Sequence, residues 1–251
     1  MWRRFMNLFY VNKSQIGQED IQIIGDDVKH IKNVLRMKQG EELMVCDCEG
    51  TNYLCKIEEV LQKEIQLSII ERMACETELP TEFYLFQGLP KSDKMELIIQ
   101  KAVELGVHEV IPVAMKRSIV KIEDKKKEAK KLDRWQAIAE SAAKQSKRGI
   151  IPNVHSVMTY KEALAYAKEF DLNLFPYEQA DGMNKSRELV KNAKGAKRIG
   201  IFIGPEGGFD DGEIEMVKEI GGEVITLGRR ILRTETAGFT ILSVLMFEME
   251  Q

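Results

Sequence analysis

Two runs of consecutive apolar residues constrain the fold of this chain most strongly. Residues 199–203 read IGIFI and residues 224–227 read VITL, both without the regular alternation of apolar and polar residues that marks a half-exposed strand. Strands of this kind are covered on both faces, as in the centre of a parallel sheet. We therefore expect two central strands here, each leading through a loop into a helix.

From about residue 80 onwards, predicted strands alternate with longer helical patterns. We predict strands at 83–86, 107–113, 172–175, 199–203 and 223–227. We predict helices at 93–105, 132–147, 161–168, 211–220 and 236–248. This alternation is typical of an α/β domain built on a parallel sheet.

The first seventy residues or so follow a different pattern. Short apolar runs at 43–48, 53–57 and 65–70 are separated by turn residues, which predicts a small antiparallel β unit. A helical pattern at 27–35 has these residues on its apolar face: Val28, Ile31, Val34 and Leu35. The chain therefore begins with a β unit that carries one helix.

The sequence predicts neither a membrane span nor a metal site. The longest strongly apolar stretch, 237–247, is too short to cross a bilayer. We recognise no export signal in residues 1–11, and so expect a cytoplasmic protein. The cysteines lack the paired C-x-x-C spacing of a zinc site and are expected to be small buried hydrophobes; they are Cys46, Cys48, Cys55 and Cys75.

Positive charge is concentrated in one part of the chain. Residues 114–149 hold 12 Lys and Arg against 5 Asp and Glu, a local charge of +7, so the remainder carries −10 of the total of −3. Two interpretations stay open on composition alone. The run is either a charged helix that simply faces water or a surface that binds phosphates.

A glycine-rich segment follows the first of the two apolar strands. Residues 204–208 read GPEGG, and the helix after them opens at Asp210 with Glu213 three positions later. The spacing matches neither the P-loop nor G-x-G-x-x-G. Ligands of open α/β sheets bind beyond the carboxyl ends of the strands, where glycines allow close approach of the backbone. We expect a ligand loop; taken alone, the segment also fits a tight turn.

The second apolar strand also ends at a glycine, Gly228. Three arginines follow before the next helix, at positions 229, 230 and 233. We expect the two strand ends to be adjacent and to converge on one site. Arg233 is the strongest candidate for a functional cation, and at least one of the other two is expected to be a solvated loop residue.

At this point the chain resembles the RsmE-type ribosomal RNA uridine N3-methyltransferases of the SPOUT superfamily. The specific strings are IGPEGGF at 203–209 and LGRRILRTETA at 227–237. Further similar strings are HIKNVLRMKQGE at 30–41, KSDKMELIIQKAVELGV at 91–107, RS at 117–118 and RW…AAKQSKRGIIP at 134–152. The resemblance spans essentially the whole chain. The chain departs from the common family pattern at Lys144 and Ile150, which affects the expected RNA contact rather than the reaction.

The resemblance implies a fold, a cofactor and partners. The fold is a PUA-like antiparallel β-barrel over 1–72, followed over 73–251 by a SPOUT-type parallel sheet with a C-terminal trefoil knot, which topology rules alone would disfavour. The cofactor is S-adenosylmethionine. The partners are ribosomal RNA or the small ribosomal subunit, and a second copy of the chain. Cofactor contacts are expected from Ile203, Gly204, Glu206, Gly207, Gly208, Leu227, Gly228, Ile231, Leu232, Arg233 and Ala237, with Pro176 and Tyr177 closing the pocket.

Roles in catalysis and in RNA binding follow from the same resemblance. Arg233 is expected to compensate charge on the uracil oxygens. Glu235 or Glu206 is a candidate to take the N3 proton, but each equally fits a role in capping a helix start or holding an arginine, so the base stays unassigned. RNA contacts are expected from Arg4, His30, Arg36, Lys91, Arg117, Gln145 and Arg148. His108 and His155 are expected to be structural.

Three other interpretations of the chain remain. One is a related SPOUT enzyme that modifies a ribose 2′-hydroxyl or a transfer RNA. Another is an RNA-binding assembly factor that has kept the fold without catalysis. A small-molecule enzyme with the same loops is the weakest, because it leaves the basic segment and the β unit unexplained.

Overall fold

The computed structural model describes residues 7–120, 125–180 and 182–250. The chain divides into two units, one of Met1–Glu78 with Lys144–Ile151 and one of Leu79–Ala143 with Pro152–Gln251. The structural boundary therefore differs from the one predicted after residue 72. The first unit keeps the connecting segment up to Glu78, and it also takes in the returning segment Lys144–Ile151.

Backbone hydrogen bonds explain why these segments belong to the first unit. The Cys75 N–H donates to the Gly50 carbonyl at 2.9 Å, and the Gly50 N–H donates to the Gly149 carbonyl at 3.0 Å. Glu49 and Ile150 form an isolated antiparallel bridge. Local sequence patterns cannot predict that residues 144–151 return to the first unit, because their partners lie about a hundred positions earlier in the chain.

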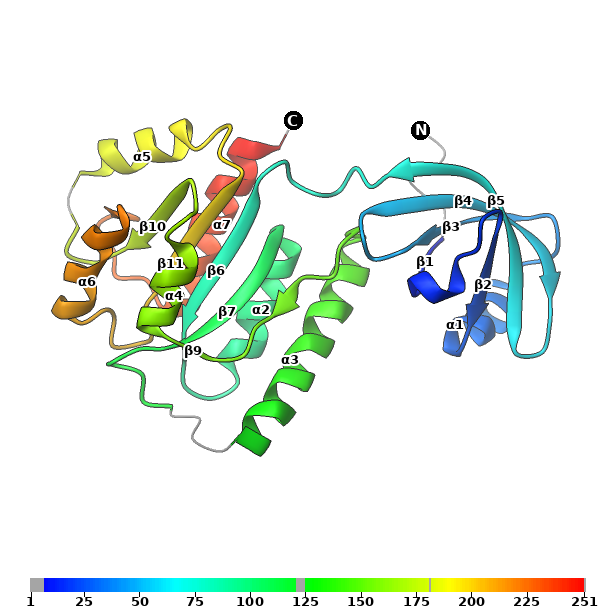
Figure 1. Ribbon diagram of the computed structural model, residues 1–251, viewed down its shortest axis with the longest axis horizontal. Helices are drawn as coiled ribbons and strands as arrows, with labels where there is room; N and C mark the ends of the chain where they lie inside the picture. The colour runs from blue at the N-terminus through cyan, green and yellow to red at the C-terminus, as the bar shows by residue number, and fades with distance from the viewer. Residues whose placement is uncertain (1–6, 121–124, 181, 251) are drawn as a thin grey trace. The chain divides into compact units, whose positions relative to one another are not determined.

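The first unit is a curled five-stranded sheet (Figure 1). Its strands are β1 (Leu8–Tyr10), β2 (Asp20–Ile24), β3 (Glu42–Cys46), β4 (Thr51–Val60) and β5 (Glu64–Ala74), in the order β1-β3-β4-β5-β2. The predicted antiparallel unit is confirmed for β2 to β5. The pair β1–β3 is parallel, contrary to that prediction, because β1 enters the sheet by a crossover rather than by a hairpin.

The helix predicted at 27–35 is present in two parts. An α-helical turn, α1 (Asp26–Lys29), runs into a π-helical segment, η3 (His30–Leu35). Val28 and Ile31 are buried as predicted, but Val34 is 67% exposed, so its predicted place on the buried face is wrong. A residue six positions after Val28 lies on a different side of the helix, since even an α-helix has about 3.6 residues per turn. A short 3-10 turn, η2 (Lys13–Gln15), precedes β2.

The second unit contains a parallel sheet, which confirms the predicted α/β class. Its strands are β6 (Glu82–Gly88), β7 (Val107–Ala114), β8 (Asn153–Val154), β9 (Met158–Thr159), β10 (Leu172–Pro176), β11 (Arg198–Ile203) and β12 (Glu223–Ile225). The order is β12-β10-β11-β6-β7-β8, with β9 also paired to β7. β11 is central as predicted. β12 is an edge strand, contrary to prediction. Its apolar residues are covered by helices and by the core cluster, and this coverage does not require a second neighbouring strand.

The helices of the second unit flank the sheet (Figure 1). They are α2 (Lys94–Glu104), α3 (Lys125–Gln145), α4 (Tyr160–Ala167), α5 (Met183–Asn192), α6 (Asp211–Val217) with the 3-10 turn η4 (Lys218–Ile220), and α7 (Thr234–Met249). α7 packs against α2, α5 and β11. The sequence did not predict α5, because its polar composition leaves only a narrow apolar stripe that includes the buried Val190. The described part of α3 begins at Lys125, seven residues earlier than predicted.

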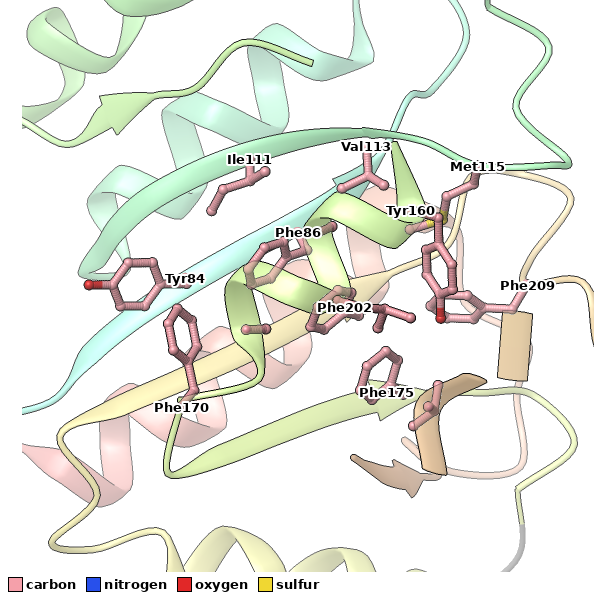
Figure 2. Close-up of a cluster of buried hydrophobic side chains, with 14 residues drawn as sticks. Tyr84, Phe86, Ile111, Val113, Met115, Tyr160, Phe170, Phe175, Phe202 and Phe209 are labelled. Atoms are coloured by element: carbon pink, nitrogen blue, oxygen red, sulfur yellow. The ribbon is translucent and has the colours of Figure 1, made fainter. Parts of the chain in front are cut away.

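A row of stacked phenylalanines forms the core of this sheet (Figure 2). Phe202 on β11 stacks on Phe86 of β6 at 4.1 Å between ring centroids and on Phe175 of β10 at 4.3 Å. Burying each ring contributes roughly 1.5–3 kcal/mol to the free energy of unfolding. Phe209, directly after the glycine-rich segment, belongs to the same cluster and is 1% exposed. The core therefore anchors the far end of that segment.

The cysteines are free thiols: Cys46 and Cys55 are buried, and Cys48 and Cys75 are half-buried. Among the residues that the structure describes, no cluster of three His, Cys, Asp or Glu is arranged to hold a metal ion. A search of the same residues also finds no helix that is both long and apolar enough to span a membrane.

Candidate functional site

A cavity of about 360 Å³ lies at the carboxyl ends of three strands of the parallel sheet. Its walls come from Pro176 to Glu178 after β10, from the glycine loop (residues 204–209) after β11, and from the arginine loop (residues 226–233) after β12. Lys94, Ile203, Thr234 and Ala237 complete the lining. The two loops converge as predicted, although β10 lies between their strands, so the strands are not adjacent.

Ten of the eleven residues predicted to contact the cofactor line this cavity. They are Ile203, Gly204, Glu206, Gly208, Leu227, Gly228, Ile231, Leu232, Arg233 and Ala237. Gly207 is not part of the lining that the described residues form. Pro176 and Tyr177 are part of it, as predicted. Seven further lining residues were not among the predicted contacts: Lys94, Glu178, Pro205, Phe209, Thr226, Arg230 and Thr234.

Two glycines are required by the backbone of these loops. A Cβ atom on Gly204 would lie 3.0 Å from the Gly208 carbonyl carbon, tighter than side chains normally allow. Gly228 has a φ of +120°, a conformation that residues with a side chain rarely adopt. The cavity floor is therefore backbone that a ligand can approach closely.

A buried hydroxyl joins the glycine loop to the start of α7. The Thr234 Oγ1 donates to the Gly204 carbonyl at 2.6 Å and accepts a hydrogen bond from the Gln87 Nε2 at 2.9 Å. Gln87 is fully buried and Thr234 is 6% exposed. No local sequence pattern indicates this link, because its three residues belong to a strand, a loop and a helix that are far apart in the chain.

Two carboxylates meet one ammonium at the edge of the cavity. The Lys94 Nζ lies 3.1 Å from the Glu206 Oε1 and 3.4 Å from the Glu235 Oε2. The Lys91 N–H also donates to Glu206, at 3.0 Å. Glu206 lines the cavity. Glu235 is not among the described lining residues and has a side chain only 13% exposed.

These contacts favour the charged forms of Glu206 and Lys94. Burial raises the pKa of the Glu206 carboxyl, but the backbone N–H groups of Glu206 and Lys91 and the Lys94 ammonium lower it by more, so the pKa lies below its ordinary value. The hydrogen bond to Glu206 raises the pKa of Lys94. The Glu235 Oε2 is buried and, within the described ranges, accepts no hydrogen bond, so Lys94 is its nearest compensation.

The arginine loop supplies cations to the cavity. Arg230 and Arg233 line it, whereas Arg229 does not belong to the described lining. All three side chains are exposed, and none has an ion-pair partner in the part of the chain that the structure describes. Arg233 directly precedes α7 with an extended backbone. Its guanidinium is thus available to a ligand.

Arg117 contacts the glycine loop from outside. Its Nη1 donates to the Gly207 carbonyl at 3.1 Å, and its Nε lies 3.8 Å from the Asp210 Oδ2. The Lys116 Nζ donates to the Asp210 Oδ1 at 2.8 Å, and this hydrogen bond lowers the pKa of Asp210. Asp210 and Glu213 form the predicted capping box of α6. Arg117, predicted to contact RNA, therefore also holds the loop.

The other predicted RNA contacts differ in exposure. His30, Arg36, Lys91 and Gln145 are exposed, and Arg4 lies outside the described residues. Arg148 is 4% exposed and pairs with Glu78 at 2.6 Å, so it does not present its charge to a partner as predicted. The described histidines 108 and 155 fit structural roles: His155 contacts Glu109 at 3.0 Å, and His108 packs on Tyr84.

Comparison with known proteins gives consistent results along the whole chain. Residues 77–246 match the family model for an RNA methyltransferase domain, and residues 23–70 match that for an RNA methyltransferase PUA domain. The ribosomal RNA small subunit methyltransferase E of Bacillus subtilis is 38% identical, covering 100% of this chain and 98% of its own length. The protein of the same name from Mesomycoplasma hyopneumoniae is 35% identical over 95% of this chain and 98% of its own.

A solved structure shares both the fold and the sequence. The crystal structure of a ribosomal RNA small subunit methyltransferase E from Neisseria gonorrhoeae, bound to S-adenosyl methionine, has a TM-score of 0.78 and 30% sequence identity. The match covers 96% of this chain and 97% of that one. Both units are therefore included in the similarity.

Proposed function

Because the chain belongs to the ribosomal RNA small subunit methyltransferase E family, we propose that it transfers a methyl group from S-adenosylmethionine to N3 of a uridine in 16S ribosomal RNA. The observation that carries this proposal is the cavity at the ends of β10, β11 and β12, where the glycine loop and the arginine loop meet. The family and its methyltransferase activity are shown by full-length similarity; the base and the atom that are methylated are our proposal.

The residues of the cavity fit the cofactor. Its volume falls within the range of about 300–1,000 Å³ that is usual for small-molecule sites. The backbone at Gly204 and Gly228 would hold the cofactor through its polar groups, and Leu227, Ile231 and Leu232 would supply apolar walls. Ile231 is 84% exposed, which leaves its apolar surface free for a ligand. S-adenosylmethionine supplies a methyl group that is already electrophilic because it is bonded to a sulfonium.

Arg233 is the residue to which we assign charge compensation. When the N3 proton of uracil leaves, negative charge spreads to the two flanking carbonyl oxygens. Arg233 is at the cavity with no competing ion pair among the described residues, so its guanidinium can donate hydrogen bonds to such an oxygen. Of the two carboxylates considered for proton removal, Glu206 is the one that lines the cavity.

The RNA would be bound by basic side chains on both units. In α3, Lys125, Lys127, Lys130 and Lys131 are exposed and can contact phosphates. His30 and Arg36 add polar groups on the unit that matches the PUA domain model. We assign Lys91, Arg117 and Gln145 to the same role, and we assign Arg148 to holding Glu78 instead. A target base inside a helix would have to be unstacked to reach the cavity.

The same proposal includes a homodimer, a cytoplasmic location and a trefoil knot. Exposed apolar residues on the neighbouring helices α2 and α7 support the dimer: Leu97 is 43%, Val244 44% and Phe247 78% exposed.

The knot would involve the arginine loop, since the chain leaves the edge strand β12 and returns to pack α7 on the central strand β11. A role in ribosome biogenesis and ribosomal RNA processing accounts for the cytoplasmic location.

The test is methyl transfer to a defined substrate. Small ribosomal subunits that lack their own N3-methyluridine are incubated with the protein and labelled S-adenosylmethionine, and the nucleosides are separated by mass spectrometry. Labelled N3-methyluridine is expected. A methylated ribose, or transfer only to transfer RNA, would replace the proposed substrate with that of a related enzyme. Failure to bind the cofactor would indicate an assembly factor.

A further inference from the structure

Lys94 is a charged residue of the cavity lining that contacts two other segments around the cavity. It comes from the first residue of α2, Glu206 from the glycine loop, and Glu235 from the first turn of α7. The Lys91 N–H reinforces the link between the start of α2 and Glu206. The ammonium therefore bridges the two elements that flank the cofactor cavity.

The burial of these groups makes the bridge more than a surface ion pair. The side chains of Lys94, Glu206 and Glu235 are 31%, 27% and 13% exposed. Exposed ion pairs contribute little to stability, but a carboxylate that is largely removed from water needs a counter-charge. Glu235 has a buried oxygen that accepts no hydrogen bond from the residues described, so removal of Lys94 would take away its counter-charge. Glu206 would keep only the hydrogen bonds from backbone N–H groups, such as that of Lys91.

We infer that Lys94 is a positioning residue: by holding Glu206 and Glu235 together, it keeps the glycine loop and the start of α7 at the separation that binds the cofactor. This inference rests on the proposed function, since it concerns the same cavity. Without the ammonium, repulsion between the two carboxylates would move the walls apart. The hydroxyl link from Thr234 to Gly204 would then hold the walls alone.

The test measures the affinity for S-adenosylhomocysteine by isothermal titration calorimetry. Lys94→Met is expected to raise Kd about tenfold, which corresponds to the loss of one modest ion-pair contribution. Lys94→Arg keeps the charge and should restore binding to near the original affinity. Lys94→Met combined with Glu235→Gln should recover part of the loss, because the uncompensated buried charge is then gone.

A matched control separates positioning from general stabilisation. Lys101 lies on the same helix and pairs with Glu104 at 2.8 Å outside the cavity, so Lys101→Met should leave Kd unchanged. In methyl transfer, Lys94→Met should raise the KM for S-adenosylmethionine with a much smaller effect on kcat. If Lys94→Met does not fold, Lys94→Gln takes its place with the same expectation.

The outcomes for the two proposals are distinguishable. If the wild-type protein does not bind S-adenosylhomocysteine, the proposed function is contradicted. If the wild-type protein binds it and a folded Lys94→Met variant has the same Kd, only the role of Lys94 is overturned. The same conclusion would follow if Lys101→Met weakened binding as much as Lys94→Met.

Discussion

Arg233 shares its charge and exposure with Arg229, but it differs from Arg229 in lining the cavity. It lines the cavity and directly precedes α7, whereas Arg229 is exposed but is not among the described lining residues. The two residues lie on one loop and have the same chemistry. Their comparison therefore isolates the effect of facing the cavity.

We expect Arg233→Ala to lower kcat about 10²-fold, the usual cost of removing one donor that stabilises developing negative charge. The measurement is the rate of labelled methyl transfer to the small subunit at saturating cofactor. Arg229→Ala serves as the control and should retain most of the turnover. Near-normal turnover of Arg233→Ala would remove the assigned role.

The hydroxyl of Thr234 is the second residue whose effect can be isolated. Thr234→Val keeps the shape of the side chain but leaves the Gly204 carbonyl without this donor and the Gln87 amide nitrogen with only its hydrogen bond to the Gly88 carbonyl. We expect the free energy of unfolding to fall by about 1–3 kcal/mol, because unsatisfied buried polar groups are costly. Urea denaturation measures the change, and Thr234→Ser should lose much less. Equal loss in both variants would show that the methyl group, not the hydroxyl, matters.

At the scale of elements, the glycine loop is held at several points. Phe209 anchors its far end in the aromatic cluster (Figure 2). The Thr234 hydroxyl donates to the Gly204 carbonyl, and Arg117 donates to the Gly207 carbonyl. A Cβ atom on Gly204 would lie 3.0 Å from the Gly208 carbonyl carbon, and one on Gly207 would lie 3.1 Å from the Arg117 Cβ. Its conformation thus depends on particular glycines.

Gly204→Ala should weaken cofactor binding, since its Cβ would lie 3.0 Å from the Gly208 carbonyl carbon and force the loop to move. The expected result is a rise of about tenfold or more in Kd for S-adenosylhomocysteine. Gly212→Ala is the control, because Gly212 lies in α6 and a Cβ there meets only the Asp210 Oδ1, at 3.5 Å. A Gly204→Ala protein that binds as well as the control would show that the loop adapts.

Local pattern predicted most elements of the sheet, but not their neighbours. Strands β6, β7, β10 and β11 lie where apolar runs predicted them, and α2 buries the face formed by Met95, Ile98, Ile99 and Ala102. The exceptions have physical causes. β12 is apolar yet lies at the edge of the sheet. α5 forms from a polar sequence because a narrow apolar stripe is enough for its contacts with α7 and β12.

At the scale of the whole molecule, α2 and α7 carry the exposed apolar residues to which we assign the proposed dimer contact: Leu97, Val244 and Phe247. Phe247→Glu should convert a dimer into a monomer, because it places a charge in an apolar contact. Sedimentation equilibrium gives the mass directly. Ile70→Glu is the control, since Ile70 is 49% exposed on β5 of the other unit and should leave the dimer intact. A monomeric original protein would contradict the proposed homodimer.

By itself, the sequence determined the class of fold, the two loops and the identity of their residues. Strand patterns and glycine positions depend on burial and backbone geometry within a few residues, so they can be recognised locally. Only the tertiary structure decided which charges meet. Lys91 contacts Glu206 across 115 positions, and Arg148 pairs with Glu78 across 70. Such partners depend on how the chain folds back on itself, which explains why Arg148 was assigned to RNA and Lys94 was overlooked.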